Sequence, residues 1–310
     1  MEPLNRSNNT LVDVVVLTDH RYVAPEQTND YINNVLHEDA IVVKALKQRG
    51  LRVERRSWDD DQFKWENAGV LLFRTTWDYF DRFAEFAPWL KKVSESCILV
   101  NPPEVLHWNI DKHYLNDLKS GGINIPPTVI IEKVDACDLK ALLKDKKWSE
   151  AVVKPCVSGA GRHTYKISES HTESTQQVMD ELLTREAMMV QEFQRNIVDR
   201  GELSLMIIDG IYTHAVLKKA REGEFRVQDD FGGSVHPYEP TNEEIRFAKD
   251  CVKASGFDLA YARVDIFRDN KGQLCLAELE LIEPELWFRF HPEAAEVLAA
   301  GITRKYFSEG

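Results

Sequence analysis

The sequence predicts an α/β protein in which a small open sheet precedes two α+β units, and three observations indicate this class. Apolar runs of strand length alternate with amphipathic helical segments over the first hundred residues. Proline pairs at 102–103 and 126–127 then mark the entry into a second unit. Beyond residue 200, apolar runs joined by short turns predict antiparallel strand pairs. We therefore expect domains at residues 1–108, 109–190 and 191–310.

The N-terminal domain is expected to hold the open α/β sheet. Its predicted strands are Val12–Leu17, Leu51–Arg55, Val70–Phe73 and Ile98–Val100, and its predicted helices are Glu38–Gln48 and Asp81–Val93. Ligands of such sheets bind beyond the carboxyl ends of the strands. Asp19 follows the first strand and Arg74 follows the third. Both are candidate substrate residues, and Arg74 suits a substrate carboxylate.

The middle of the chain combines lysines with a glycine-containing loop. The predicted elements are a helix from Asn109 towards Leu118, strands Thr128–Ile131, Ala151–Lys154 and His163–Ile167, and a helix at Asp135–Leu143. The loop at residues 157–162 fits neither a Walker A sequence nor GxGxxG. Because it follows a strand that carries Lys154, its backbone N–H groups could cover phosphates. The alternatives are a tight structural turn and surface positions for Lys112 and Lys154.

The C-terminal domain is expected to contain antiparallel strands and two helices. The predicted strands are Met188–Phe193, Glu202–Ile208 and Ile211–Lys219, and the predicted helices are Asn242–Ala254 and Pro292–Ala300. Between them, residues 223–233 form a long polar segment with several glycines. A loop of this length and composition is typical of a mobile lid.

Two further apolar runs predict a hairpin that carries acidic residues. Strand parity places Asp265, Glu278 and Glu280 on one face together with Arg263, and a turn centred on residues 270–271 sets Arg263 opposite Glu278. Clustered carboxylates raise one another's pKa unless a cation neutralises them. Hard oxygen ligands without a nearby cysteine or histidine suit Mg²⁺ or Mn²⁺. A solvated acidic face and a salt bridge between Arg263 and Glu278 are the alternatives.

Composition excludes several other classes of function. The chain has 310 residues, 43% hydrophobic and 29% charged, and its net charge of −12 disfavours broad binding to nucleic acids or to anionic membranes. Five scattered cysteines lack CxxC spacing, which disfavours zinc and a disulfide framework. The first ten residues lack an apolar signal core, and no run reaches the length of a membrane span. We expect a cytoplasmic protein that could form a homodimer.

The order of these motifs resembles the ATP-grasp superfamily over roughly residues 100 to 305. The resemblance implies that ATP phosphates contact Lys112 and Lys154 beneath a loop containing Ser158, Gly159, Gly161 and Arg162. It implies that backbone groups of Glu192 and Phe193, next to Gln191, bind adenine and that Glu202 binds ribose. The implied metal ligands, for two Mg²⁺ ions, are Asp265, Glu278 and Glu280, with Glu280 in the position of the family's usual Asn. Arg263 would hold an oxyanion, and Lys218 and Arg226 would contact phosphate or the acyl group.

More specifically, segments 74–79, 108–112 and 278–284 resemble the group that contains glutathione synthetase, ribosomal-protein glutamate ligases and cycloserine-forming ligases. This resemblance implies a carboxylate–amine ligase that acts on a small amino-acid or dipeptide-like substrate through an acyl phosphate and releases ADP and phosphate. Two alternatives stay open. The chain could add amino acids to a peptide or protein terminus, or it could be an ATP-binding sensor without turnover.

Overall fold

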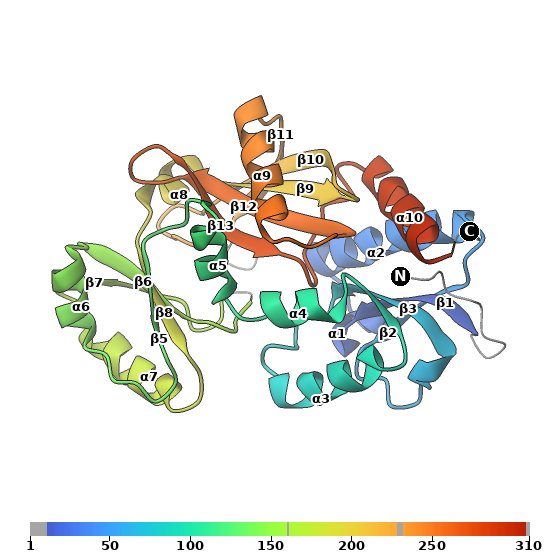
Figure 1. The fold of residues 1–310 in the computed structure, drawn as a ribbon, viewed down its shortest axis with the longest axis horizontal. Helices are drawn as coiled ribbons and strands as arrows, with labels where there is room; N and C mark the ends of the chain where they lie inside the picture. The colour runs from blue at the N-terminus through green and yellow to red at the C-terminus, as the bar shows by residue number, and fades with distance from the viewer. Residues whose placement is uncertain (1–10, 160, 228–231, 308–310) are drawn as a thin grey trace.

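The computed structural model describes residues 11–159, 161–227 and 232–307, and Figure 1 shows three sheets with their helices. The predictions for Met1–Thr10, and for the part of the polar loop at residues 228–231, lie outside the described residues. No helix of the described chain is both long and apolar enough to cross a bilayer. The predicted fold class, an α/β N-terminal sheet followed by α+β units, is confirmed.

The N-terminal sheet is parallel, with the strand order β2-β1-β3-β4. Its strands are β1 (Val12–Thr18), β2 (Val53–Ser57), β3 (Ala68–Thr75) and β4 (Ile98–Val100), and its helices are α1 (His20–Val23), α2 (Asp30–Gln48), α3 (Phe83–Ser94) and the 3₁₀ turn η1 (Trp65–Asn67). Every residue of β1 and β3 is buried. Alternate residues of β1 face α2 or α3, because helices cover both faces of the sheet.

The central sheet is antiparallel and has a core of its own. Its strands β5 (Thr128–Ile131), β6 (Glu150–Pro155), β7 (Tyr165–Ser168) and β8 (Met188–Glu192) pair in the order β5-β8-β6-β7. Helices α6 (Leu139–Lys146) and α7 (Glu173–Leu183) pack on one face through leucines and a methionine. Asp138 begins α6 by accepting a hydrogen bond from the Ala141 backbone N–H group.

The third sheet is the largest and shares a core with the N-terminal domain. Its strands are β9 (Glu202–Ile208), β10 (Ile211–Lys219), β11 (Ser234–Tyr238), β12 (Tyr261–Arg268) and β13 (Leu274–Glu280), in the order β11-β10-β9-β12-β13. Helices α5 (Tyr114–Ser120) and α9 (Asn242–Ala254) pack on one face, and α10 (Glu293–Tyr306) joins the other face to α2. The short helices α4 (Pro103–Asn109) and α8 (Arg195–Arg200) complete the fold. The three domain ranges stay a proposal.

The hairpin of β12 and β13 differs from the predicted register. Arg263 pairs with Glu280 and Asp265 with Glu278, and a bulge follows Asp265. The predicted pairing of Arg263 with Glu278 is wrong for two reasons. The turn is one residue wider, since the Asp269 backbone N–H group donates to the Gln273 carbonyl oxygen at 2.8 Å, and the bulge shifts the register by one more residue. The shift is two residues, so each side chain keeps its predicted face.

One predicted helix is broken in the structure. The chain from Asn109 to Leu118 was expected to be continuous, but α4 ends at Asn109 and α5 begins at Tyr114. Lys112 lies in the break, and its backbone N–H group donates to the Cys156 carbonyl oxygen at 3.0 Å. This contact with the end of β6 replaces the local helical hydrogen bond, which places the Lys112 side chain between two sheets.

Candidate active site

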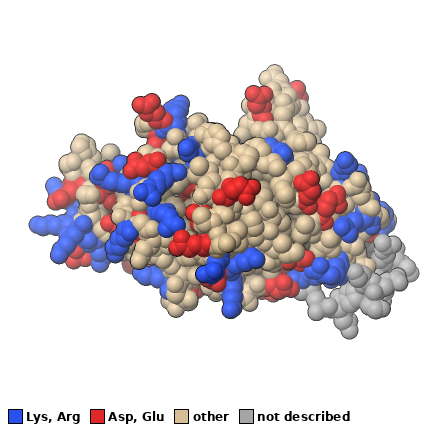
Figure 2. All heavy atoms as spheres, turned by 90° about the horizontal axis from the view of Figure 1, so that it is seen from above, with Lys and Arg blue, Asp and Glu red and all other residues tan. Residues whose placement is uncertain are grey.

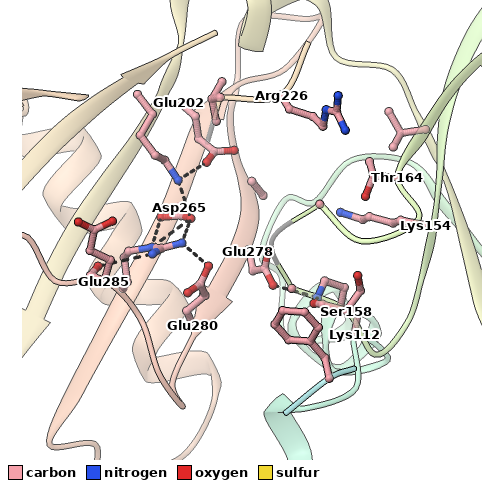
Figure 3. Close-up of a pocket in the computed structure, with 18 of the residues that line it drawn as sticks. Lys112, Lys154, Ser158, Thr164, Glu202, Arg226, Asp265, Glu278, Glu280 and Glu285 are labelled. Atoms are coloured by element: carbon pink, nitrogen blue, oxygen red, sulfur yellow. Dashed lines mark hydrogen bonds and ion pairs between the residues drawn. The ribbon is translucent and has the colours of Figure 1, made fainter. Parts of the chain in front are cut away.

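A cavity of about 570 Å³ is lined by strands of the central and third sheets and by helices and loops of the N-terminal domain (Figure 3). Most of the predicted site residues line it: Lys112, Lys154, Ser158, Gly159, Gly161, Gln191, Glu192, Phe193, Glu202, Lys218, Arg226, Arg263, Asp265, Glu278 and Glu280. Three predicted residues do not line it: Asp19, Arg74 and Arg162. The cavity is large enough for a nucleotide and a small second substrate.

Asp265 is the most deeply held carboxylate of the acidic group. It is 3% exposed, and it accepts hydrogen bonds from Lys218 Nζ at 2.9 Å and from Ser204 Oγ at 2.6 Å. Arg263 also donates to it. Burial would raise the pKa of Asp265, but Arg263 and Lys218 outweigh burial and hold the pKa at about 2. Asp265 is therefore ionised at neutral pH.

Glu278 and Glu280 come from the partner strand of the hairpin. Glu278 forms an ion pair with Lys112 at 3.0 Å, and Glu280 accepts a hydrogen bond from Arg263. The expected alternative, a salt bridge from Arg263 to Glu278, is wrong, since Arg263 pairs with Asp265 and Glu280 instead. Burial, and repulsion from Glu278 and Asp265, raise the pKa of Glu280 to about 7. Crowding of the carboxylates therefore favours the neutral form of Glu280 despite its pairing with Arg263.

The two predicted phosphate lysines differ in their partners. Lys112 is buried, and its ammonium donates to the Ser158 carbonyl oxygen at 2.6 Å as well as pairing with Glu278. Lys154 lies on β6 and forms no ion pair with any described residue. Burial, with help from the nearby Lys112 charge, lowers its pKa. In Figure 3 both lysines lie across the cavity from Asp265, which leaves a cationic wall facing an acidic one.

The glycine-containing loop packs against the N-terminal domain. A Cβ atom on Gly159 would lie 2.6 Å from Cε1 of Phe80, so only glycine allows this approach. Ser158 Oγ donates to the Arg162 carbonyl oxygen at 3.0 Å. Arg162 itself turns away from the cavity and pairs with Glu186 at 2.8 Å. Its position suits anchoring of the loop rather than direct contact with a ligand.

The segment predicted to bind adenine lies at the cavity, but its donors are engaged. The Glu192 backbone N–H group donates to Pro127 at 2.9 Å and that of Phe193 donates to Glu150 at 3.0 Å. Their carbonyl oxygens each keep a lone pair for a ligand. Glu202, predicted to bind ribose, is buried and pairs with Lys218 at 2.5 Å. Lys218 therefore bridges Glu202 and Asp265.

The two predicted substrate residues of the N-terminal domain are buried and hold neighbouring residues in place rather than lining the cavity. Asp19 is 0% exposed and accepts a 2.6 Å hydrogen bond from Arg21, a cavity residue that the sequence analysis missed. Arg74 is 1% exposed and donates to the Pro284 carbonyl oxygen at 3.0 Å. Asp19 follows β1, as predicted, whereas Arg74 lies within β3 rather than after it. The neighbours of both residues already provide the opposite charge. They act on the cavity through Arg21 and through the segment after β13.

The segment after β13 and the aromatic residues opposite it were not predicted to line the cavity. The additional cavity residues with side chains suited to a second substrate are Arg21, Tyr22, Tyr31, Trp77, Tyr79, Glu283, Glu285 and Trp287. The sequence offered one signal, because segments 74–79 and 278–284 carry the resemblance to small-molecule ligases. Only the packing of the N-terminal domain against the third sheet brings these two segments together.

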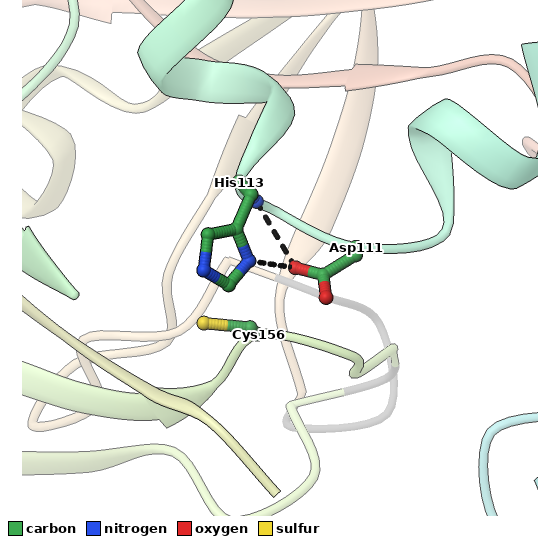
Figure 4. Close-up of side chains that lie close together, drawn as sticks. All are labelled: Asp111, His113 and Cys156. Carbon is green, nitrogen blue, oxygen red and sulfur yellow. Dashed lines mark hydrogen bonds and ion pairs between the residues drawn. The ribbon is translucent and has the colours of Figure 1, made fainter. Parts of the chain in front are cut away.

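Two further groups of potential metal ligands lie outside this acidic face. They are Asp111, His113 and Cys156 (Figure 4), and His20, Asp59 and Asp78. The His113 ring lies between two carboxylates: Asp111, on Nδ1, and Glu132, 3.0 Å from Nε2. Burial and the nearby Asp111 raise the pKa of Cys156 to about 12, which keeps the thiol protonated. The group of Asp111, His113 and Cys156 is therefore explained by the pairing of His113 with two carboxylates, without a metal ion.

The outer surface does not add a second electrostatic site on the face that Figure 2 shows. Basic and acidic side chains are interspersed there, whereas nucleic-acid binding is typical of a continuous basic surface. The charge that matters for a small anionic ligand is local and lies inside the cavity.

Three sheets around a cavity with a cationic wall, a glycine-containing loop and a carboxylate-bearing hairpin define an ATP-grasp ligase. A sequence profile of the RimK-like ATP-grasp domain matches residues 112–281, and the chain belongs to this family. A profile described as the N-terminal domain of the D-cycloserine synthetase DcsG matches residues 14–101.

Individual relatives agree with this assignment. The chain is 28% identical over 287 residues to the cycloserine biosynthesis protein DcsG of Streptomyces lavendulae, which covers 85% of this chain and 92% of that protein. A crystal structure of D-cycloserine synthetase DcsG has the same fold, with a TM-score of 0.83, 24% identity and coverage of 94% of this chain and 99% of that one. The D-alanine–D-alanine ligase from Bacillus anthracis matches with a TM-score of 0.62, 14% identity and coverage of 94% and 96%.

Proposed function

We propose that this protein is an ATP-dependent, ADP-forming ligase that joins the carboxylate of a small amino-acid-like acceptor to an amine or related nucleophile through an acyl phosphate. The observation that carries this proposal is that one cavity brings Lys112 and Lys154 together with the carboxylates of Asp265, Glu278 and Glu280. A triphosphate with a bound divalent cation complements both walls at once. The unpaired Lys154 supports an anionic ligand, because a partly buried ammonium group gains from a counter-charge.

The acidic face suits Mg²⁺ by its donor set. Asp265, Glu278 and Glu280 offer only oxygen ligands, which hard divalent cations prefer. Burial and crowded carboxylates raise the pKa of Glu280, and a cation bound at this face would favour its ionised form. Bound Mg²⁺ would neutralise phosphate charge at this face. Mn²⁺ has the same ligand preferences.

Individual side chains would then act in the two steps of the reaction. Lys112 and Lys154 hold the phosphates and disperse charge as an acceptor carboxylate oxygen attacks the γ-phosphorus and the bond to the ADP oxygen breaks. The nucleophile next attacks the acyl carbon, and the carbon–oxygen bond to phosphate breaks as the nucleophile loses its proton. Arg263, 11% exposed at the cavity, can donate to the tetrahedral oxyanion. Glu202 would bind the ribose, and Arg226, which also lines the cavity, would contact the phosphate or the acyl group.

A small acceptor is favoured by two features. The aromatic side chains of the N-terminal domain enclose the cavity, and this domain matches the cycloserine ligase profile. A second candidate, addition of amino acids to a peptide or protein terminus, is favoured by 26% identity over 159 residues to a probable alpha-L-glutamate ligase of Thioalkalivibrio sulfidiphilus. That match covers 51% of this chain, and the small-molecule relative covers more.

The test is ADP release by purified protein with Mg·ATP and separate pools of amino acids, dipeptides and protein extract. Stimulation by small amino acids or dipeptides supports the proposal. Stimulation by extract protein alone favours the peptide-terminus ligase, and nucleotide binding without ADP release in any pool favours a sensor. The Asp265→Asn variant should remove the stimulated rate, which separates turnover at this site from a contaminating ATPase.

A further inference from the structure

Glu283 is a carboxyl group at the cavity that has no ion-pair partner among the described residues. It lines the cavity on the segment after β13, and it forms no ion pair with any lysine, arginine or histidine of the described residues. Its acidic neighbours differ in this respect. Glu278 pairs with Lys112, and Glu285 pairs with Arg289.

The surroundings of Glu283 include aromatic side chains as well as acidic ones. Its carboxyl group shares a hydrogen bond with the Tyr79 hydroxyl, and its backbone carbonyl accepts a 2.9 Å hydrogen bond from Trp77 Nε1. Trp77 in turn packs edge-on against Tyr22, with ring centroids 5.9 Å apart. Tyr22, Trp77 and Tyr79 all line the cavity. The N-terminal domain therefore fixes the Glu283 backbone and supplies ring surfaces beside its carboxylate.

We propose that Glu283 binds the ammonium group of the amino-acid-like acceptor, an inference that rests on the proposed function. A primary ammonium donates hydrogen bonds to a carboxylate and is attracted to aromatic ring faces. A magnesium ion instead keeps water molecules and requires several oxygen ligands in octahedral geometry, which aromatic walls do not supply. Burial and repulsion from Glu280 raise the pKa of Glu283 to about 8, and a bound ammonium group would lower it again. A cation bound there would restore the ionised form.

Binding can be tested without turnover. Thermal unfolding of the full chain with Mg·ADP would be followed with D-alanine, D-serine and L-glutamate, and with the N-acetylated form of each. Wild type should be stabilised by at least one free amino acid and not by its acetylated form. Glu283→Gln should weaken that apparent affinity about 10-fold or more, since a hydrogen bond between charged groups is lost. Glu283→Asp should retain part of the response, and Glu104→Gln, an exposed control, should retain all of it.

Specific outcomes would overturn the inference. They are a wild type that responds to no free amino acid, equal responses to free and acetylated forms, and a Glu283→Gln variant with unchanged affinity. A variant that needs more Mg²⁺ at unchanged amino-acid affinity would instead identify Glu283 as a metal ligand. Urea unfolding of each variant separates loss of binding from loss of fold. The proposed function fails separately, if wild type releases no ADP with any acceptor, whichever probes it binds.

Discussion

Arg74 and Pro284 are 210 residues apart in the chain, yet Arg74 Nη1 donates a 3.0 Å hydrogen bond to the Pro284 carbonyl oxygen. The same guanidinium lies between Glu38 and Asp39 of α2, at 3.9 and 3.7 Å. Glu38 in turn accepts the backbone N–H group of Phe288 at 2.8 Å. One buried ionic group therefore fixes the segment that carries Glu283 to the N-terminal domain.

Arg74→Met should destabilise the fold by about 3 kcal/mol, because it leaves buried carboxylates with too little positive charge. Urea unfolding would measure this change. Arg185→Met, which removes an exposed pair with Glu181, is the control and should change stability little. If Arg74→Met kept its stability and lost only acceptor binding, the sequence-based role of Arg74 as a substrate ligand would be supported instead.

Asp265→Asn and Glu278→Gln should each abolish acceptor-stimulated ADP release while retaining the fold, because each removes an expected metal ligand. Losses should exceed the roughly 10- to 100-fold that loss of a residue supporting a metal ligand costs. Turnover with Mg·ATP and circular dichroism would be measured together. The exposed Asp145→Asn serves as the control, and wild-type rates in either site variant would refute the metal role.

Lys154→Ala should weaken ATP binding about 10- to 100-fold, because a hydrogen bond from a charged donor to phosphate is lost. Calorimetric titration with Mg and a non-hydrolysable ATP analogue would give the dissociation constant. Lys140→Ala removes an exposed lysine of the same sheet's helix α6 and should leave it unchanged. An unaltered dissociation constant for Lys154→Ala would mean that the ammonium does not contact the nucleotide.

His214 should make stability depend on pH. Its Nε2 donates to the Leu286 carbonyl oxygen at 2.8 Å in the neutral form, and burial lowers its pKa to about 4. The unfolded chain, with a histidine pKa of about 6.5, takes up this proton first. The stabilising contribution is therefore complete above about pH 6.5 and is lost as pH falls towards 4.

Between pH 7.5 and 5, this contribution should fall by about 2 kcal/mol. Glu280 and Glu283 titrate in the opposite sense, because their raised pKa values favour the folded state at lower pH. The relevant quantity is hence the difference in unfolding free energy between wild type and His214→Gln at each pH. A difference that does not change over this range would contradict the assignment. His236→Gln is the exposed control.

Much of the fold could be predicted from local patterns. Three elements were predicted to the residue: Glu202–Ile208, Ile211–Lys219 and Asn242–Ala254. A short turn separates the two strands, and a capping box begins the helix. Helix α7 and strand β11 were missed. None of the residues of β11 is fully buried, so its pattern carries little hydrophobic signal.

The sequence by itself determined the order of the lysines, the glycine-containing loop and the acidic hairpin, and the face on which each acid lies. These properties depend on spacing along the chain, and a two-residue change of register preserves side-chain parity. Tertiary structure alone decided that Arg74 and Asp19 are supports, that Arg263 pairs with Glu280, and that Glu283 meets Trp77 and Tyr79. Those contacts join segments up to 210 residues apart. Local periodicity carries no information about which distant charges burial will bring together.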